Sequence, residues 1–304
     1  MARRRKKKNN GAKVFVIALI VVLVIGLAVV WATKGNDEPE VPESQPETVE
    51  SAPEEVVEEE PAPFPDITTL ELIWGSDYTV EAQGYIWVSS DTKIADVDNG
   101  TIIPKRTGSC TVTATGSDGV HEIAVTVSPK IEEIDGVTYV NGILIANKTY
   151  SVPEDFGGDN DEAWAAFDAM AAAAAEEGLS IYGSSVYRSY YTQEAIYYRE
   201  LNDYGIDFAD QSTARPGHSE HQTGLAFDLN SITTDFKDTP EGIWVAEHCH
   251  EYGFILRYME GKEHLTGYMY EPWHFRYIGE QATDIHYSGL CLEEYLGIDS
   301  EYKD

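Results

Sequence analysis

Residues 219 to 228 read Ser219-Glu220-His221-Gln222-Thr223-Gly224-Leu225-Ala226-Phe227-Asp228. They contain an imidazole and a carboxylate, and a second imidazole follows about fifty residues later in Glu271-Pro272-Trp273-His274. His221, Asp228 and His274 can supply three ligands of a tetrahedral zinc ion, which leaves the fourth position open for water. Glu271 stands beside the third ligand and is a candidate base. The pattern therefore predicts a metal hydrolase.

The spacing of these residues also predicts the local backbone. On a strand, Asp228 points away from the core when its neighbours Phe227 and Leu229 face it. His221 lies seven residues before Asp228, and this odd spacing would put the two side chains on opposite faces of one regular strand. We therefore expect Gly224 to interrupt the strand and His221 to lie on the loop before it.

Residues 131–304 combine helix and strand patterns. Helices are predicted over 161–177 and 192–204, and a third has Thr239 as its N-cap and Gly253 after its end. Strands are predicted over 180–184, 226–229 and 273–278. Pro272 predicts irregular backbone where the last of these strands begins. Together these patterns predict an α+β domain.

Residues 66–130 have a different pattern, in which apolar and polar residues alternate between Gly- and Asp-rich turns. Several short alternating strands predict a small all-β sandwich. Five segments resemble the bacterial group-two immunoglobulin-like domain, namely Trp87-Val88-Ser89-Ser90-Asp91, Ile94-Ala95-Asp96-Val97-Asp98, Asn99-Gly100-Thr101-Ile102, Gly108-Ser109-Cys110-Thr111-Val112-Thr113-Ala114 and Ala124-Val125-Thr126-Val127. The resemblance implies a spacer or a wall contact, and Cys110 is predicted to be a small buried side chain.

Residues 1–34 predict a cytoplasmic basic tail and a transmembrane anchor. Residues 3–8 are all Arg or Lys, and residues 14–32 form an uncharged apolar run long enough to span a bilayer as a helix. The basic cluster predicts that the N-terminus stays in the cytoplasm and that the following residues lie outside. A cleaved signal peptide is the alternative, because Val30-Trp31-Ala32 resembles a cleavage site. Residues 35–65 predict a disordered, acidic, Pro-rich linker.

Charge and cysteine content limit the partners and the redox chemistry. All 53 acidic residues follow Lys34, whereas eight of the 21 basic residues come at or before it. Such a strongly acidic surface argues against nucleic acid as a partner. The three cysteines, Cys110, Cys249 and Cys291, are too few for a disulfide framework. A single disulfide between Cys249 and Cys291 is the alternative.

The metal motif belongs to a longer set of segments in the last domain. They are Asn147-Lys148 with Val152-Pro153, Tyr187-Arg188-Ser189-Tyr190 with Gln193, Ala214-Arg215-Pro216-Gly217-His218-Ser219-Glu220-His221-Gln222-Thr223-Gly224, Tyr252-Gly253-Phe254-Ile255 with Arg257-Tyr258, Thr266-Gly267-Tyr268, and Tyr270-Glu271-Pro272-Trp273-His274-Phe275-Arg276-Tyr277. This set resembles the zinc D-alanyl-D-alanine carboxypeptidases of VanY type. The resemblance implies that His221, Asp228 and His274 bind zinc and that Glu271 is the general base.

Three further residues are predicted to hold the substrate. Arg188 is the candidate for binding a terminal carboxylate or a developing oxyanion, because its planar guanidinium can make two charge-assisted hydrogen bonds. A structural ion pair is the alternative for Arg188. The resemblance implies that Gln193 and Ser219 are substrate hydrogen-bond partners, with a loop cap as the alternative for Ser219.

We therefore expect a membrane-anchored, extracytoplasmic carboxypeptidase with Zn2+ as its cofactor, which removes the terminal D-alanine from peptidoglycan stem peptides. An L,D-carboxypeptidase or a D-Ala-D-Ala dipeptidase of the same fold would use the same metal chemistry with a different pocket. An inactive wall-binding module is the alternative outside enzymes. The sequence leaves the oligomeric state open.

Overall fold

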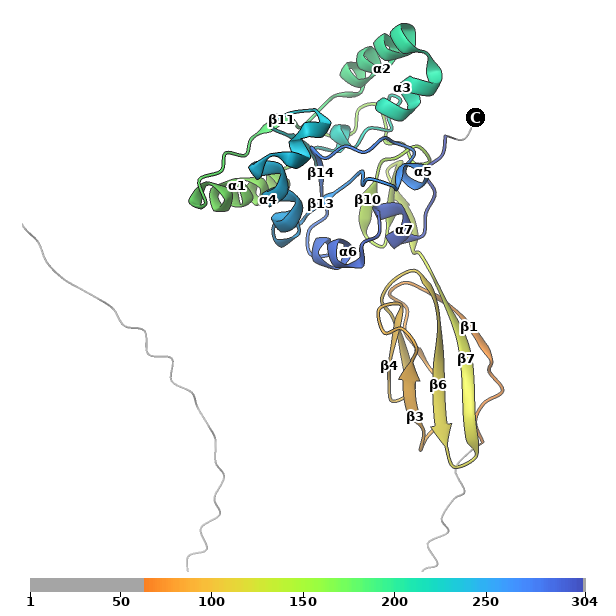
Figure 1. Cartoon of the computed structure of the whole chain (residues 1–304). Coiled ribbons are helices and arrows are strands. Elements are labelled where there is room, and N and C mark those ends of the chain that lie inside the picture. Colours follow the sequence, from red (N-terminus) through yellow and green to blue (C-terminus); the bar gives the residue numbers. More distant parts are fainter. Residues whose placement is uncertain (1–62, 303–304) are drawn as a thin grey trace, which may run out of the picture. The chain divides into compact units, whose positions relative to one another are not determined.

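The computed structural model describes residues 63–302 (Figure 1). The predicted tail and anchor (1–34), and the predicted linker apart from its last three residues, lie outside the described residues. Between residues 63 and 302, no helix has both the length and the apolar character needed to cross a bilayer.

Two β-sheets form the first part of the described chain. A four-stranded sheet has the order β1-β7-β6-β3 and a three-stranded sheet the order β2-β5-β4. Strand β1 runs parallel to β7, and the other pairs are antiparallel. The strands are β1 (Thr69–Ile73), β2 (Tyr78–Thr79), β3 (Ile86–Ser89), β4 (Ala95–Asp98), β5 (Thr101–Pro104), β6 (Gly108–Gly116) and β7 (Gly119–Ser128).

The two sheets share one apolar core. Ala95 and Ile102 of the small sheet pack in the same cluster as Val112 and Val125 of the large sheet. Cys110 is half-buried against this cluster, as the alternation of β6 predicts. The predicted two-sheet architecture is therefore confirmed, whereas the likeness to immunoglobulin-like domains stays a prediction.

The second part of the described chain is an α+β domain, as predicted. It contains a four-stranded antiparallel sheet of order β11-β12-β14-β13 and a three-stranded sheet of order β10-β9-β8. The strands are β8 (Ile131–Ile134), β9 (Val137–Val140), β10 (Ile143–Ile145), β11 (Gly183–Ser185), β12 (Ala226–Leu229), β13 (Phe254–Leu256) and β14 (His274–Tyr277). The helices are α1 (Asp161–Glu176), α2 (Tyr190–Tyr204), α3 (Ile206–Ser212), α4 (Pro240–His248), α5 (Glu263–Thr266), α6 (Ala282–Ser288) and α7 (Leu292–Leu296).

The four-stranded sheet has one apolar face, which packs against α1 and α4. Phe227 of β12 stacks on Phe167 of α1, with ring centroids 5.2 Å apart, and Phe275 of β14 lies in the same cluster. Leu229 also lies in this cluster, so Phe227 and Leu229 face the core as predicted. Asp228 therefore points to the opposite face of the sheet.

Most predicted elements of this domain are confirmed. The third predicted helix is α-helical only to His248, and the 3-10 helix η3 (Cys249–Tyr252) continues it to Gly253. One predicted strand is displaced. The prediction over 180–184 was wrong at its start, because β11 begins at Gly183 and is irregular in register between Gly183 and Ser185. Before Gly183, the side chain of Asn230 makes the hydrogen bonds to the backbone that a neighbouring strand would otherwise make. It accepts a hydrogen bond from Tyr182 N at 2.9 Å and donates one to Ser180 O at 2.8 Å.

Gly224 ends the turn before β12, as the spacing of His221 and Asp228 predicts. It adopts φ +70°, and a Cβ atom added to it would lie 2.0 Å from Gly158 O. Its N–H donates to His221 O at 3.2 Å, which closes the short 3-10 helix η1 (Glu220–Thr223). Both the backbone conformation and the close approach of a second chain segment therefore require glycine here.

Substituting Gly224 by Ala should destabilise the domain in two ways, whereas Gly178→Ala should do so in only one. Gly178 has a similar φ of +83° but open space around its Cβ position. Gly178→Ala should cost about 1 to 2 kcal/mol through backbone strain, and Gly224→Ala should cost about 1 to 3 kcal/mol more through the clash. Urea unfolding of both variants measures the difference, and equal losses would contradict the clash.

Candidate metal centre

The three predicted ligands meet at one end of the β12–β14 pair. Asp228 of β12 lies directly opposite His274 of β14 in the sheet register. His221 reaches the same place from η1, immediately before the turn at Gly224. Ligand atoms of the three residues all lie within 4.8 Å of one another, and all three side chains are buried. The three segments that were predicted to converge, those of His221, Asp228 and His274, therefore do so in the structure.

The carboxylate of Asp228 lies between the two imidazoles. His221 Nε2 is 3.2 Å from Asp228 Oδ2, and His274 Nδ1 is 3.1 Å from Asp228 Oδ1. Despite this short distance, Asp228 Oδ1 is buried without a hydrogen-bond donor among the described residues. Although burial opposes its charge, the two histidines hold the pKa of Asp228 well below its usual range. An ionised carboxylate with a free buried lone pair, beside two imidazole nitrogens, fits a zinc ion.

Each histidine is oriented by a partner on its other ring nitrogen. His221 Nδ1 donates to the carbonyl oxygen of Val186 at 2.6 Å, so its Nε2 carries the lone pair that faces the site. His274 Nε2 lies 3.3 Å from Glu220 Oε2, and its Nδ1 faces the site. The two histidines therefore present different ring nitrogens to the same point, as metal ligands with fixed outer partners do.

Glu271 lies next to the ligands without completing the ligand group. Its Oε2 is 3.5 Å from His274 Nδ1, the nitrogen that also faces Asp228. Burial raises the pKa of Glu271 to about 8. A nearby divalent cation favours the ionised form of such a carboxyl group. Glu271 is therefore placed to take up and release a proton beside the metal position.

Arg188 and Ser219 line the cavity that opens onto the ligands, as predicted. The cavity has a volume of about 350 Å³, and its wall also includes Tyr258, Tyr268 and Trp273. Ser219 precedes η1, but its side chain makes no capping hydrogen bond there. Ser219 therefore does not cap η1, and its predicted contact with the substrate stays a prediction.

Gln193 lies behind Arg188 and not in the cavity wall. Its side chain is fully buried, and its Oε1 accepts a hydrogen bond from Arg188 Nη1 at 2.8 Å. Its Nε2 donates to Thr213 Oγ1 at 3.1 Å and to Ala214 O at 2.6 Å. In this structure Gln193 therefore contacts Arg188, and its predicted contact with the substrate stays a prediction.

Arg188 is held by neutral groups more closely than by a charge. Besides Gln193, its Nη2 donates to Ser185 Oγ at 3.1 Å, whereas Asp228 Oδ2 lies 3.7 Å away. No acceptor for its Nε is found among the described residues. Burial lowers the pKa of Arg188, but a guanidinium keeps its charge in proteins. A close structural ion pair is therefore not its main contact.

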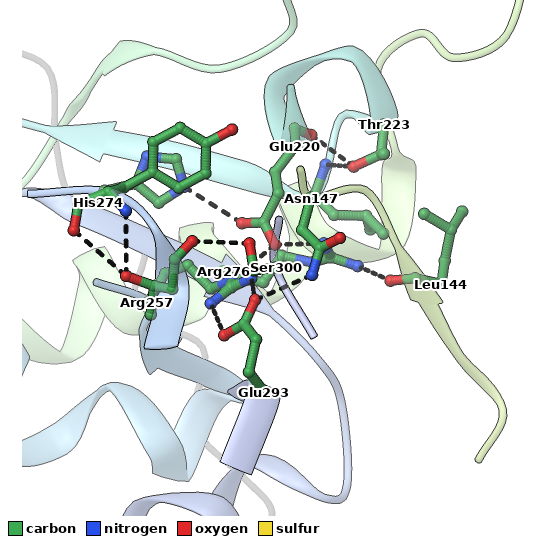
Figure 2. A network of polar contacts seen from close by, with 12 residues as sticks. Leu144, Asn147, Glu220, Thr223, Arg257, His274, Arg276, Glu293 and Ser300 are labelled. Carbon is green, nitrogen blue, oxygen red and sulfur yellow. Dashed lines mark hydrogen bonds and ion pairs between the residues drawn. The ribbon is translucent and has the colours of Figure 1, made fainter. Parts of the chain in front are cut away.

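Sequence reasoning missed Glu220, although it stands inside the quoted motif. Its side chain is only 2% exposed and contacts His274, Arg257 and Arg276 (Figure 2). Although burial opposes its charge, the two arginines hold the pKa of Glu220 well below its usual range. The sequence did contain a sign of a buried acidic partner, because Arg257 and Arg276 each lie beside apolar residues of a strand-like segment.

The cysteines take no part in the site. Cys249 and Cys291 are buried and unpaired. Cys249 lies in the apolar cluster behind the four-stranded sheet, and Cys291 is the N-cap of α7. Burial raises the pKa of the Cys249 thiol to about 12. Both thiols are therefore inert at neutral pH.

Comparison with known proteins assigns the chain to a family. A family model described as VanY, D-alanyl-D-alanine carboxypeptidase, matches residues 160–280. The putative carboxypeptidase YodJ of Bacillus subtilis (strain 168) is 35% identical over 197 residues, which cover 55% of this chain and 72% of that protein. The chain belongs to the VanY family of carboxypeptidases.

Two further relatives differ in their described specificity. A D-alanyl-D-alanine carboxypeptidase of Enterococcus faecium is 39% identical over 121 residues, which cover 40% of this chain and 37% of that protein. The solved structure of the LdcB LD-carboxypeptidase, described as revealing the basis of peptidoglycan recognition, is 39% identical with a TM-score of 0.53. That match covers 57% of this chain and 98% of the LdcB chain.

Zinc binding should release protons and strengthen as the pH rises. Although burial opposes its charge, the carboxylates of Asp228 and Glu220 raise the pKa of His274 to about 9. At neutral pH, below this value, His274 is protonated without metal and must lose its proton to bind zinc. Zinc affinity should therefore rise from neutral pH to about pH 9 and then level off. Titration calorimetry in buffers of different ionisation enthalpy measures the protons released, and an affinity independent of pH over this range would contradict a protonated His274 in the metal-free protein.

Proposed function

We propose that this chain is a zinc-dependent carboxypeptidase that removes the C-terminal D-alanine from peptidoglycan stem peptides. The observation that carries the proposal is the meeting of His221, Asp228 and His274 with Glu271 and Arg188 at one cavity. A metal position, a buried carboxyl group and a fixed cation are together sufficient for metal-assisted hydrolysis of a C-terminal peptide bond. The intact set argues against an inactive wall-binding module.

His221, Asp228 and His274 would hold the zinc ion, which when bound polarises the scissile carbonyl and makes water more acidic. Glu271 then accepts the proton of the attacking water. The same carboxyl group can return that proton to the amine of the departing D-alanine. Its burial suits this exchange, because a pKa raised towards neutral lets one group act as base and then as acid.

Arg188 is proposed to bind the terminal carboxylate of the substrate. Gln193 and Ser185 fix its guanidinium plane, and the cavity leaves part of that plane open. A guanidinium binds a carboxylate through two parallel hydrogen bonds, which also selects peptides with a free C-terminus. Ser219 is proposed as a hydrogen-bond partner of the same bound peptide.

As the first candidate for the cleaved bond we propose the one that joins an L-centre to the terminal D-alanine. The solved LD-carboxypeptidase structure supports this candidate, because it is 39% identical to the chain with a TM-score of 0.53. The description of the family model supports the second candidate, cleavage between two D-alanines. Both activities release the same amino acid and use the same proposed catalytic residues.

We further propose that the catalytic domain lies outside the cytoplasmic membrane. The basic residues 3–8 and the apolar run 14–32 support a single anchoring helix, with residues 1–34 as its tail and span. The linker and the two-sheet domain would then separate the site from the bilayer. This arrangement gives the site access to peptidoglycan.

Release of D-alanine from three substrates tests the proposed function. The full chain with zinc should release D-alanine from a stem tetrapeptide faster than from a pentapeptide or from free D-Ala-D-Ala. Glu271→Gln should keep its zinc and lose activity by about 10² to 10⁴-fold, because the general base is gone while the ligands remain. Release from the pentapeptide alone would favour the D,D candidate, and preferred cleavage of the free dipeptide would favour a dipeptidase. No release from any substrate, or full activity of Glu271→Gln, would contradict the proposal.

A further inference from the structure

A buried network of four charges joins the candidate metal centre to helix α7 near the C-terminus (Figure 2). Glu220 accepts hydrogen bonds from Arg257 Nε at 2.7 Å and from Arg276 Nη1 at 3.0 Å. Arg257 also makes a two-point ion pair with Glu293 of α7, with Nη1–Oε2 and Nη2–Oε1 distances of 2.7 and 2.6 Å. All four side chains are at most 2% exposed.

The two oxygens of Glu220 have separate partners. Both arginines bind Oε1, whereas Oε2 lies 3.3 Å from Nε2 of His274. An ionised carboxylate can only accept hydrogen bonds, so the proton of the neutral imidazole belongs on Nε2. The lone pair of His274 is then on Nδ1, which faces Asp228 and Glu271.

The two histidine ligands are therefore oriented by different means. His221 donates to a backbone carbonyl, whose position is set by the fold itself. A glutamate side chain has several rotamers and fixes nothing unless it is itself held. The two arginines on Oε1 supply that restraint, and Arg276 is tied in turn to the carbonyl of Leu144 at 2.6 Å.

Glu293 extends the restraint to α7. It neutralises the second half of the Arg257 guanidinium and accepts a further hydrogen bond from Asn147 Nδ2 at 3.2 Å. Burying four charges is a poor way to gain stability, because apolar residues of similar size often stabilise a core as well. This network contacts His274 of the metal centre through Glu220. The position that it gives to His274 explains the network better than a gain in stability does.

We propose that Glu220 is a positioning residue that fixes the ring orientation and tautomer of His274, and that Arg257, anchored by Glu293, fixes Glu220. The proposal deepens the proposed function and rests on it, because the ion at the centre is taken to be zinc. Glu220 lies in the wall of the cavity, and we propose that it acts through His274 and not through contact with the ion.

Zinc affinity of the full chain, measured by competition with a chelator, tests the proposal. Glu220→Gln should bind zinc about 10 to 100-fold more weakly, as the loss of an outer partner of a metal-bound histidine does. At saturating zinc, kcat should fall while KM for the tetrapeptide stays near the wild-type value. Asp210→Asn is the matched control, since it breaks the Arg215–Asp210 ion pair of 2.8 Å without touching a ligand, and it should leave zinc affinity unchanged.

Nitrogen-15 NMR of the histidines in zinc-loaded protein provides a readout that a general loss of stability would not mimic. The wild type should show one zinc-bound histidine protonated on Nδ1, which is His221, and one protonated on Nε2, which is His274. In Glu220→Gln the Nε2 proton of His274 should shift and exchange faster with water, while the His221 signal stays in place. If Glu220→Gln does not fold, Glu293→Gln takes its place with the same readouts and a smaller expected loss of affinity.

Wild-type zinc affinity together with an unchanged His274 signal in the variant would overturn the positioning role. If the proposed function is wrong, the result is different. The zinc-bound wild type would then show the expected tautomers of His221 and His274 but release no D-alanine from any substrate. The two ideas can therefore fail separately.

Discussion

The register of β12 against β14 is the constraint on which the site depends. It sets Asp228 opposite His274, Phe227 opposite Phe275, and Ala226 opposite Arg276. The phenylalanine pair faces the core with α1, so the two flanking pairs face the other side of the sheet. A slip of β12 by one residue would turn Asp228 into the apolar core and Phe227 onto the face that carries His274. The same packing that stabilises the sheet thus places two ligands and Arg276 on one face.

The remaining groups reach this face through segments that the sheet alone does not determine. His221 depends on the left-handed turn at Gly224 and on the close approach of Gly158 O. Glu271 depends on the irregular turn before β14, where His274 N donates to Glu271 O at 3.1 Å. Arg188 depends on α2, through Gln193. The centre is therefore an assembly of one rigid strand pair and three short loops.

This division explains what could be predicted from the sequence. The bounds of β12 were predicted correctly because Gly224 and the alternation around Phe227 act locally. That His221, Asp228 and His274 meet could be predicted because the combination of the two motifs is specific. The positions of Gln193 and Glu220 could not be predicted. The sequence around a polar residue looks the same whether its side chain faces a substrate or a buried arginine. Their partners are distant in sequence, such as Thr213 for Gln193 and Arg257 for Glu220.

Anomalous X-ray diffraction from crystals of the zinc-loaded protein tests the metal centre most directly. One zinc peak is predicted on the open face of β12 and β14, at about 2.0 to 2.2 Å from His221 Nε2, from His274 Nδ1 and from a carboxylate oxygen of Asp228. Glu271 should lie beside the ion without displacing one of these ligands. A zinc ion bound through Nε2 of His274, or no zinc among these three residues, would contradict the account.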